Sequence, residues 1–515
     1  MHRGMHQDSG SNFLHSWIAR AAARTPDKAW LVRADDGEMA SYARLREITS
    51  RLAAFLRSRN LRPNDRIALL ADNSIEQLVC YLGIIAAGVT ACTVHVEMNR
   101  NQLDDIFARL KPKLILYQEG LRLDDLLAGA DAPRLRIGRY AEPSADTLFG
   151  ELARFPPSEP INPARPDDDA VILFTSGTSA KPKGVVLNFH EYLSNIDPLA
   201  EGFGITADDR LYDFRPFSWA SAQLLGALAP INRGATLVLA EKFSASRFFA
   251  HLRDRGVTIA TGNPTTLNIL LNTESNTHCD DLPSLRFITS SSAPLLLDEW
   301  KRFEQKFGIP VAQGYGASEA SWIAASPGET RRLGTVGRPF AYHDLAIVDG
   351  EGRRLPAGEI GYVELGAWPE HPFRYLEDNG AIRTHSRGRF RTGDVGNLDA
   401  DGFLILTGRE KELIIRGGAK ISPMEIDSCL MQCAEVAEAA TIGIPDAVYG
   451  EEVISYVVTR PGASLDTSAL LQHCAARLPA FKAPKQIVLS DVLPKTERGK
   501  LDRKALVERW RRDSG

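Results

Sequence analysis

Residues 171–187 read VILFTSGTSAKPKGVVL, which is an apolar run, a segment of small and polar residues, and a second apolar run. The two apolar runs predict strands, and the Ser, Thr and Gly residues between them predict a loop. Small residues let a backbone approach a ligand closely, and hydroxyl and N–H groups donate hydrogen bonds to phosphate oxygens. Lys183 adds a positive charge at the far end of the loop. The stretch therefore predicts a phosphate-binding loop between two strands.

The P-loop of nucleotide triphosphatases does not describe this segment. Counted from Gly177, that pattern requires a second Gly where Pro182 stands and a Ser or Thr where Gly184 stands. A P-loop also runs into a helix, whereas residues 185–187 predict a strand. An ordinary hairpin turn is the alternative interpretation of such a loop taken alone.

Bulk properties narrow the class of protein. A chain of 515 residues is too long for one hydrophobic core and predicts two or more domains. The formal net charge of −4 gives no reason to expect a nucleic-acid or membrane partner. The six cysteines lack metal-binding spacing and predict reduced thiols. The sequence has no signal-peptide pattern and no run of the roughly 18 apolar residues that a membrane span needs, so we expect the cytoplasm.

Helical and strand patterns alternate from residue 13, and this alternation predicts an α/β fold with a mainly parallel sheet covered by helices. The helices that we expect include residues 42–59, 75–87, 217–228 and 298–307, and the strands include 66–70, 114–117 and 210–214. Beyond Gly334, glycine-punctuated alternation predicts a smaller antiparallel β subdomain. From about Lys411 the pattern predicts a separate small α+β domain.

Further motifs carry chemistry. Residues 313–319 read QGYGASE, and an aromatic ring between two glycines can lie flat against a purine. A carboxylate such as that of Glu319 beside a triphosphate loop needs a cation between the two negative charges. Residues 391–394 read RTGD, and the carboxylate of Asp394 can accept hydrogen bonds from vicinal ribose hydroxyls. The longer segments are DGFLILTGREKELIIRGGAKISPMEID at 401–427 and LPKTERGKLDR at 493–503.

These motifs, in this order, resemble the acyl-adenylate-forming superfamily, which contains the acyl-CoA synthetases, the adenylation domains of peptide synthetases and firefly luciferase. The resemblance extends from residue 13 to Arg503. It implies a disordered tail at 1–12, an N-terminal adenylate-forming domain at 13–408, a hinge at 409–411 and a mobile C-terminal domain at 412–515. It also implies ATP, Mg²⁺ and coenzyme A as cofactors or co-substrates.

The resemblance also implies roles for individual residues. Lys500, Lys183 and Glu319 are the expected catalytic groups, with Glu319 and Thr175 at the metal, Tyr315 on the adenine, and Asp394 and Arg409 on the ribose. The remaining expected ATP or AMP contacts are Ser176, Gly177, Thr178, Ser179, Ser292, Ala293, Gly316 and Ser318. Lys411 is the expected hinge, Gly417 and Gly418 line the thiol passage, and the acyl pocket comprises Trp219, Ala222, Gln223, Asn263 and Gly314.

The function that the resemblance implies is an AMP-forming carboxylic acid–CoA ligase. ATP converts the acid to an acyl-adenylate with loss of pyrophosphate, and after rotation about Lys411 a thiol displaces AMP. One alternative is a freestanding adenylation enzyme that loads a carrier protein, and another is an inactive nucleotide-binding interaction module. The expected substrate is a small or medium acid with polar or aromatic character, because Gln223 and Asn263 can hydrogen-bond a polar acyl group.

Two features depart from a simple match. Ala180 stands where many relatives have Gly, which costs about 1 kcal/mol or somewhat more if that position needs a positive φ. The segment GASEA at residues 316–320 is one glycine short of the GxSxG nucleophile elbow of serine hydrolases, with Asp394 and His473 as conceivable triad partners. The hydrolase hypothesis leaves every other motif unexplained.

Overall fold

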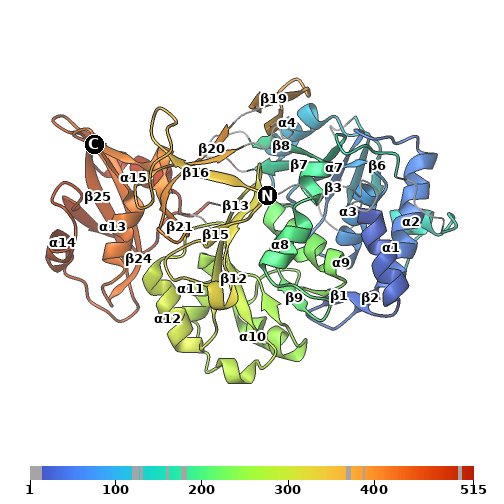
Figure 1. Cartoon of the computed structure of the whole chain (residues 1–515), viewed down its shortest axis with the longest axis horizontal. Coiled ribbons are helices and arrows are strands. Elements are labelled where there is room, and N and C mark those ends of the chain that lie inside the picture. The colour runs from blue at the N-terminus through green and yellow to red at the C-terminus, as the bar shows by residue number, and fades with distance from the viewer. Residues whose placement is uncertain are drawn as a thin grey trace.

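The computed structural model describes residues 14–118, 127, 131–157, 162–175, 182–366, 373–386, 389–496 and 501–514. Figure 1 shows a large N-terminal part and, at the left in deeper orange and red, a smaller C-terminal part. In the described part of the chain, the strands form four sheets, three of them in the N-terminal part. The predicted tail at residues 1–12 lies outside the described residues.

The first sheet contains, in spatial order, β19 (Ile382–Ser386), β18 (Phe373–Leu376), β8 (Lys183–Asn188), β7 (Asp169–Thr175), β4 (Thr90–Thr93), β3 (Arg66–Leu70), β5 (Leu114–Tyr117) and β6 (Arg134–Arg136). From β7 to β6 neighbouring strands are parallel, and from β7 to β19 they are antiparallel. The sequences RIALL in β3 and LILY in β5 are nearly wholly apolar, as expected for strands covered on both faces.

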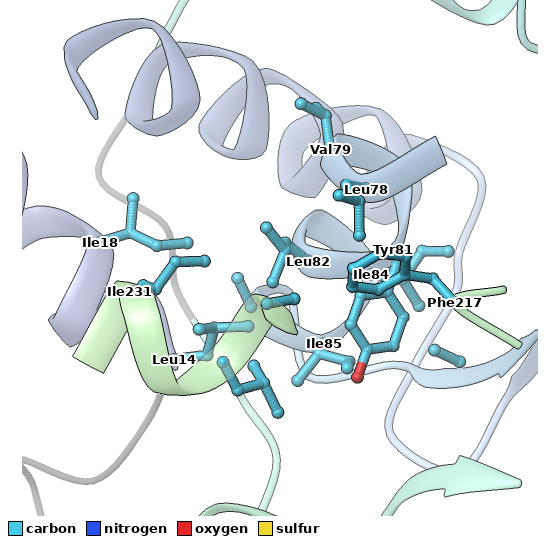
Figure 2. Packing of buried hydrophobic residues seen from close by; sticks show 14 of the residues in the cluster. Leu14, Ile18, Leu78, Val79, Tyr81, Leu82, Ile84, Ile85, Phe217 and Ile231 are labelled. Carbon is cyan, nitrogen blue, oxygen red and sulfur yellow. The ribbon is translucent and has the colours of Figure 1, made fainter. Parts of the chain in front are cut away.

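The helices of this region are α1 (Leu14–Arg24), α2 (Tyr42–Ser58), α3 (Ile75–Ala86), α4 (Arg100–Leu110), α6 (Leu148–Leu152), α7 (Phe189–Leu193), α8 (Ile196–Gly202), the π-helix η1 (Ala222–Leu228) and α9 (Ala229–Arg233). α3 is apolar around nearly its whole circumference and is therefore buried among other elements. Figure 2 shows Leu14 and Ile18 of α1 beside Ile231 of α9, with Leu82 and Ile85 of α3 in the same cluster. This core fixes the elements behind the predicted acyl pocket.

The second sheet contains, in spatial order, β15 (Arg338–Pro339), β14 (Ser321–Ala325), β13 (Val311–Ala317), β12 (Phe287–Ser290), β11 (Ile259–Ala260), β9 (Arg210–Asp213), β10 (Thr236–Leu239), β1 (Ala29–Arg33) and β2 (Met39–Ser41). Its central strands, from β1 to β13, are parallel. The accompanying helices are α10 (Ala245–Asp254), α11 (Pro264–Asn272), α12 (Leu297–Phe307) and the 3₁₀ turn η2 (Cys279–Asp281). Parallel strands end at one edge of a sheet, and such an edge commonly binds ligands.

The third sheet contains β16 (Asp344–Val348), β17 (Gly361–Gly366), β20 (Arg389–Leu398) and β21 (Leu404–Arg409), and the short 3₁₀ turn η3 (Gly328–Thr330) precedes it. All its neighbouring strands are antiparallel, which confirms the predicted small β subdomain. The 3₁₀ turn η4 (Glu410–Glu412) follows β21 directly.

The C-terminal sheet contains β23 (Ala419–Ile421), β22 (Ile414–Arg416), β25 (Gly450–Thr459) and β24 (Val436–Asp446), with β26 (Gln486–Leu489) pairing alongside β25. Its helices are α13 (Pro423–Leu430), α14 (Thr467–Ala475) and α15 (Arg503–Ser514). This sheet has its own apolar clusters, including Ile426, Leu430 and Val453. The expected α/β fold, with a C-terminal α+β domain, is confirmed.

The predicted helix at 217–228 is the main difference in local structure. Residues 222–228 form the π-helix η1, which continues into α9. Gly226 permits a close approach inside this segment, because a Cβ there would lie 2.5 Å from Asp213 Oδ2. A continuous apolar pattern does not distinguish an α-helix from a π-helix, and π-helical segments often occur at functional sites.

Candidate active site

The predicted phosphate loop lies between β7 and β8, which are antiparallel. Their register pairs Phe174 with Gly184 and Thr175 with Lys183, so the two ends of the loop are adjacent. The side chain of Lys183 is exposed at the first position of β8. The expected contacts Ser176, Gly177, Thr178 and Ser179, together with Ala180, lie outside the described residues.

The predicted charged groups Lys183 and Glu319 share one aromatic neighbour, Tyr375 of β18. Lys183 Nζ lies 5.6 Å from the centroid of the Tyr375 ring. The Tyr375 hydroxyl donates a hydrogen bond to Glu319 Oε1 at 3.2 Å. Burial and the negative charge of Glu319 raise the pKa of Tyr375 well above its ordinary value, so the phenol stays protonated and donates.

A second cluster joins the predicted adenine and ribose residues. The Tyr315 hydroxyl donates to Asp394 Oδ2 at 2.5 Å, and Arg409 Nε lies 3.0 Å from Asp394 Oδ1. Strand pairing places Asp394 opposite Arg409. Asp394 is buried, and burial raises the pKa of Tyr315 well above its ordinary value. Motifs that are distant in sequence therefore meet around one carboxylate.

Gly314 and Gly316, on either side of Tyr315, are required by close packing against β14. A Cβ on Gly314 would lie 2.4 Å from Trp322 Cζ3, and one on Gly316 would lie 2.6 Å from the backbone oxygen of Ser321. The sequence interpretation explained these glycines by space for a purine, and the structure adds this crowding as a second reason. Ser318 is half-buried just before Glu319.

The predicted acyl-pocket residues follow the carboxyl ends of parallel strands in the second sheet. Trp219 follows β9 and precedes η1, whereas Asn263 follows β11. Ser292 and Ala293 follow β12, and Ser292 has a φ of +73°, a left-handed conformation that side chains disfavour. Strained backbone of this kind is concentrated at functional sites, and this edge is where a ligand is expected.

The predicted substrate contact of Gln223 needs correction, because its amide group is fully engaged by the protein. Gln223 Oε1 accepts from Tyr192 at 2.6 Å, and Nε2 donates to Thr93 Oγ1 at 2.8 Å and to the Phe217 carbonyl at 2.7 Å. Gln223 and the neighbouring Ala222 are completely buried. Gln223 therefore fixes η1 behind the pocket and has no polar atom left for an acyl group.

The side chain of Asn263 also makes structural hydrogen bonds. It caps the N-terminus of α11, where its Oδ1 accepts from the Thr266 N–H at 2.8 Å and from Thr266 Oγ1 at 3.0 Å. A side-chain cap of this type stabilises a helix by about 1 kcal/mol. Only the amide nitrogen of Asn263 is therefore a candidate for contact with a substrate.

The expected hinge and thiol-passage residues lie where the third sheet gives way to the C-terminal sheet. Lys411 is exposed in η4, between the end of β21 and the start of β22. Gly417 and Gly418 form the turn between β22 and β23, with φ values of +56° and +84° that favour glycine. Their roles remain predictions.

Lys500 lies outside the described residues, but both flanks of its segment are anchored. An isolated antiparallel bridge joins Lys495 to Leu501. Arg503 pairs with Asp427 Oδ2 at 2.7 Å and with Glu412 Oε2 at 3.2 Å, and it donates to the Thr441 carbonyl at 2.9 Å. Arg503, which follows this segment, is thus bound to Glu412, the residue next to Lys411.

A cavity of about 900 Å³ lies between the N-terminal part and the C-terminal domain. Its walls include Leu295, Gln313 and Thr407 on one side and Met424 and Lys482 on the other. Lys420 Nζ donates to the Tyr362 hydroxyl at 2.6 Å across this boundary. The two parts therefore enclose a space large enough for part of a substrate.

The described residues do not support the serine-hydrolase alternative. His473 Nε2 donates to the Cys429 carbonyl at 3.0 Å within the C-terminal domain. Asp394 is engaged by Tyr315 and Arg409. The histidine that this hypothesis needs is therefore engaged within the C-terminal domain, and its carboxylate is engaged by two other side chains.

The comparison with protein families decides between the remaining interpretations. Residues 18–366 match the AMP-binding enzyme model, and residues 425–500 match the AMP-binding enzyme C-terminal domain. The chain belongs to the AMP-binding enzyme family. Within this family it lies in the acyl-CoA ligase branch, as the sequence motifs predicted.

Relatives in this family match over nearly their whole length. A sulfoacetate–CoA ligase of Cupriavidus necator is 31% identical, over 96% of this chain and 97% of that protein. An oxalate–CoA ligase of Arabidopsis thaliana is 30% identical, over 97% and 99%. The crystal structure of ATP-bound MatB from Rhodopseudomonas palustris has a TM-score of 0.85 and 27% identity, covering 96% of this chain and 99% of that one.

The chain is accordingly an AMP-forming acid–CoA ligase, and CoA ligases of the AMP-binding family use ATP and CoA. The predicted family, fold class and reaction are confirmed. The alternative acceptor, a carrier protein, gains no support from these relatives. None of the described helices is both long and apolar enough to cross a membrane.

Proposed function

We propose that this ligase activates a compact carboxylic acid at the edge of the second sheet, with the nucleotide held between Tyr315, Asp394 and the loop before Lys183. The observation that carries this proposal is the convergence of Tyr315 and Arg409 on the buried carboxylate of Asp394. Asp394 accepts the ribose hydroxyls, Arg409 supports it, and the face of Tyr315 packs on the adenine.

In the first half-reaction, a substrate carboxylate oxygen attacks the α-phosphorus of ATP, and the bond to pyrophosphate breaks. Lys183 offsets triphosphate charge, and Lys500 draws the two repelling anions together. Glu319 suits Mg²⁺, because Oε1 accepts from Tyr375 while Oε2 has no protein partner in the described part of the chain. When bound, Mg²⁺ neutralises phosphate charge.

In the second half-reaction, the thiolate of coenzyme A attacks the acyl carbon, and AMP leaves. Rotation about Lys411 withdraws Lys500 and brings the turn at Gly417 and Gly418 to the site. The cavity between the two parts of the chain offers a route for the thiol arm, and Lys420 on its C-terminal side suits an anionic group of CoA.

A compact acid is favoured by the wall behind Gly314. The Trp322 indole fills the space that a longer acyl chain would need beyond this glycine, and Phe203 holds it edge-on at 5.2 Å. The hydroxyl groups of Ser218 and Ser290 have no hydrogen-bond partner among the described residues, so polar acyl groups are favoured. Two relatives carry names that refer to compact polar acids, sulfoacetate and oxalate.

ATP–pyrophosphate exchange over a panel of acids, followed by thioester detection, tests this proposal. We expect exchange with compact polar or small aromatic acids and little with long-chain fatty acids. We expect thioester on coenzyme A. A preference for long-chain acids, or thioester formed on a phosphopantetheinyl carrier protein but not on coenzyme A, would overturn it.

A further inference from the structure

Tyr375 lies where two parts of the active site meet, although no motif identifies it. It belongs to β18, which pairs antiparallel with β8 in a register that places Tyr375 opposite Val185 and Leu376 opposite Gly184. Tyr375 is therefore beside the first residues of β8, where the phosphate loop ends at Lys183. An ion pair of 2.7 Å between Arg374 and the buried Asp169 fastens β18 to β7.

The ring and the hydroxyl of Tyr375 contact side chains of opposite charge. The negative face of an aromatic ring attracts an ammonium group, and Lys183 Nζ lies 5.6 Å from the ring centroid. The phenolic hydroxyl donates to Glu319 Oε1 at 3.2 Å, and a hydrogen bond to a charged carboxylate is stronger than one between neutral groups. His385 packs edge-on against the same ring, with centroids 4.9 Å apart, and restricts its rotation.

The arrangement keeps Lys183 and Glu319 from neutralising each other. Among the described residues, no ion pair joins these two side chains; each contacts Tyr375 instead. A direct pair would engage the ammonium group that should meet the triphosphate and the carboxylate that should meet a cation. The ring separates the two charges, and the hydroxyl orients Oε1 of Glu319, whereas Oε2 has no hydrogen-bond partner among the described residues.

We propose that Tyr375 is a positioning residue for adenylation, which orients Glu319 for Mg²⁺ through its hydroxyl and holds Lys183 at the triphosphate through its ring. This inference rests on the roles given to Lys183 and Glu319 in the proposed function. It separates the contribution of the hydroxyl from that of the ring, and each can be removed alone.

Two substitutions test the two contributions. Tyr375→Phe removes the hydroxyl and keeps the ring, so the Mg²⁺ concentration for half-maximal pyrophosphate exchange should rise ~10-fold, with the KM for ATP at saturating Mg²⁺ nearly unchanged. Tyr375→Leu removes both, so the KM for ATP should also rise, by ~3-fold or more. Calorimetric titration of a non-hydrolysable ATP analogue at stepped Mg²⁺ concentrations should show the same split without turnover.

Tyr140 provides a matched control, because it also lies beneath a cation, Arg44, at 5.1 Å, and takes no part in the proposed site. Tyr140→Phe should leave both the Mg²⁺ requirement and the KM for ATP unchanged. An unaltered Mg²⁺ requirement in Tyr375→Phe would overturn the role of the hydroxyl, even if Tyr375→Leu fails to fold. A wild-type enzyme without exchange for any acid would instead refute the proposed function itself.

Discussion

Tyr315 and Asp394, 79 residues apart in the chain, are joined by a hydrogen bond of 2.5 Å from the phenolic hydroxyl to Oδ2. The other carboxylate oxygen lies 3.0 Å from Arg409 Nε. Strand β13 of the second sheet and strands β20 and β21 of the third sheet therefore meet at one carboxylate. The proposed nucleotide site lies where these two sheets are joined, and a hydrogen bond and an ion pair already orient its polar groups.

Asp394→Asn should weaken ATP binding while leaving the fold intact. The amide is the same size, but it lacks the charge that strengthens hydrogen bonds from ribose hydroxyls and pairs with Arg409. The KM for ATP in pyrophosphate exchange should rise ~10-fold or more, whereas the KM for the acid should change little. A KM for ATP equal to that of the wild type would contradict the ribose role.

Trp322→Leu should admit longer acids. The smaller side chain vacates space beyond Gly314 and should cost less than the ~3–5 kcal/mol expected for Trp322→Ala. Exchange rates over a series of acids of increasing length should shift toward longer members, with the KM for ATP unchanged. Trp300→Leu is the control, because Trp300 is equally buried in a different cluster, among the helices α10, α11 and α12. The same acid profile in both variants would count against Trp322 as the wall.

Glu299→Gln should remove a pH dependence of stability. Burial raises the pKa of Glu299 to about 7 from its ordinary value of 4.5, so between these pH values the folded protein holds a proton that the unfolded chain releases. The free energy of unfolding should therefore fall as pH rises through this window. Glutamine keeps the bond from Asn268 Nδ2, which is 2.7 Å long in the wild type, and cannot ionise.

Between pH 5 and pH 8, the free energy of unfolding should fall less in Glu299→Gln than in the wild type. The difference between the two falls should be on the order of 1–3 kcal/mol. Urea unfolding at the two pH values measures this difference. Parallel pH profiles for the two proteins would show that Glu299 keeps an ordinary pKa.

Lys411→Pro should impair one half-reaction more than the other. Lys411 is exposed in η4 between two sheets, so proline there mainly restricts the backbone and removes an N–H group. Single-turnover rates of acyl-adenylate formation and of thioester formation from added acyl-adenylate measure the effect. Equal, wild-type rates in both steps would argue against alternation about this residue.

The sequence predicted elements best where the pattern is local. The strand predicted at residues 66–70 agrees with β3, and the helix predicted from Tyr42 agrees with α2. A short apolar run predicts a buried strand and a 3.6-residue period predicts a helix, and both patterns are local in the sequence. The pattern predicted a helix at η1 but not its π-helical form, because an apolar run does not distinguish the two. Gln223 of η1 is held by partners from α3, β4 and α7. The sequence predicted Gln223 as a pocket residue because its amide can hydrogen-bond a substrate. Its actual hydrogen-bond partners cannot be read from the sequence.

Site residues were predicted where they belong to a sequence motif and missed where they do not. Tyr315, Asp394 and Arg409 were predicted because each sits in a motif, and the structure brings them together through strand pairing and a hydrogen bond. Tyr375 was not predicted, because its contact with Glu319, 56 residues away, depends on the register of β18 on β8 and is not visible in the sequence. Arg503 was seen only as part of a motif, although in the structure it forms ion pairs with Glu412 and Asp427.

The central claim is that acyl-adenylate formation depends on Lys500, delivered from the C-terminal domain to a nucleotide held by Tyr315 and Asp394. The direct test compares wild type and Lys500→Ala in ATP–pyrophosphate exchange and in thioester formation from pre-made acyl-adenylate. The account predicts that the variant loses exchange by ~100-fold or more but keeps thioester formation. Wild-type exchange in Lys500→Ala, or equal loss of both half-reactions, would contradict it.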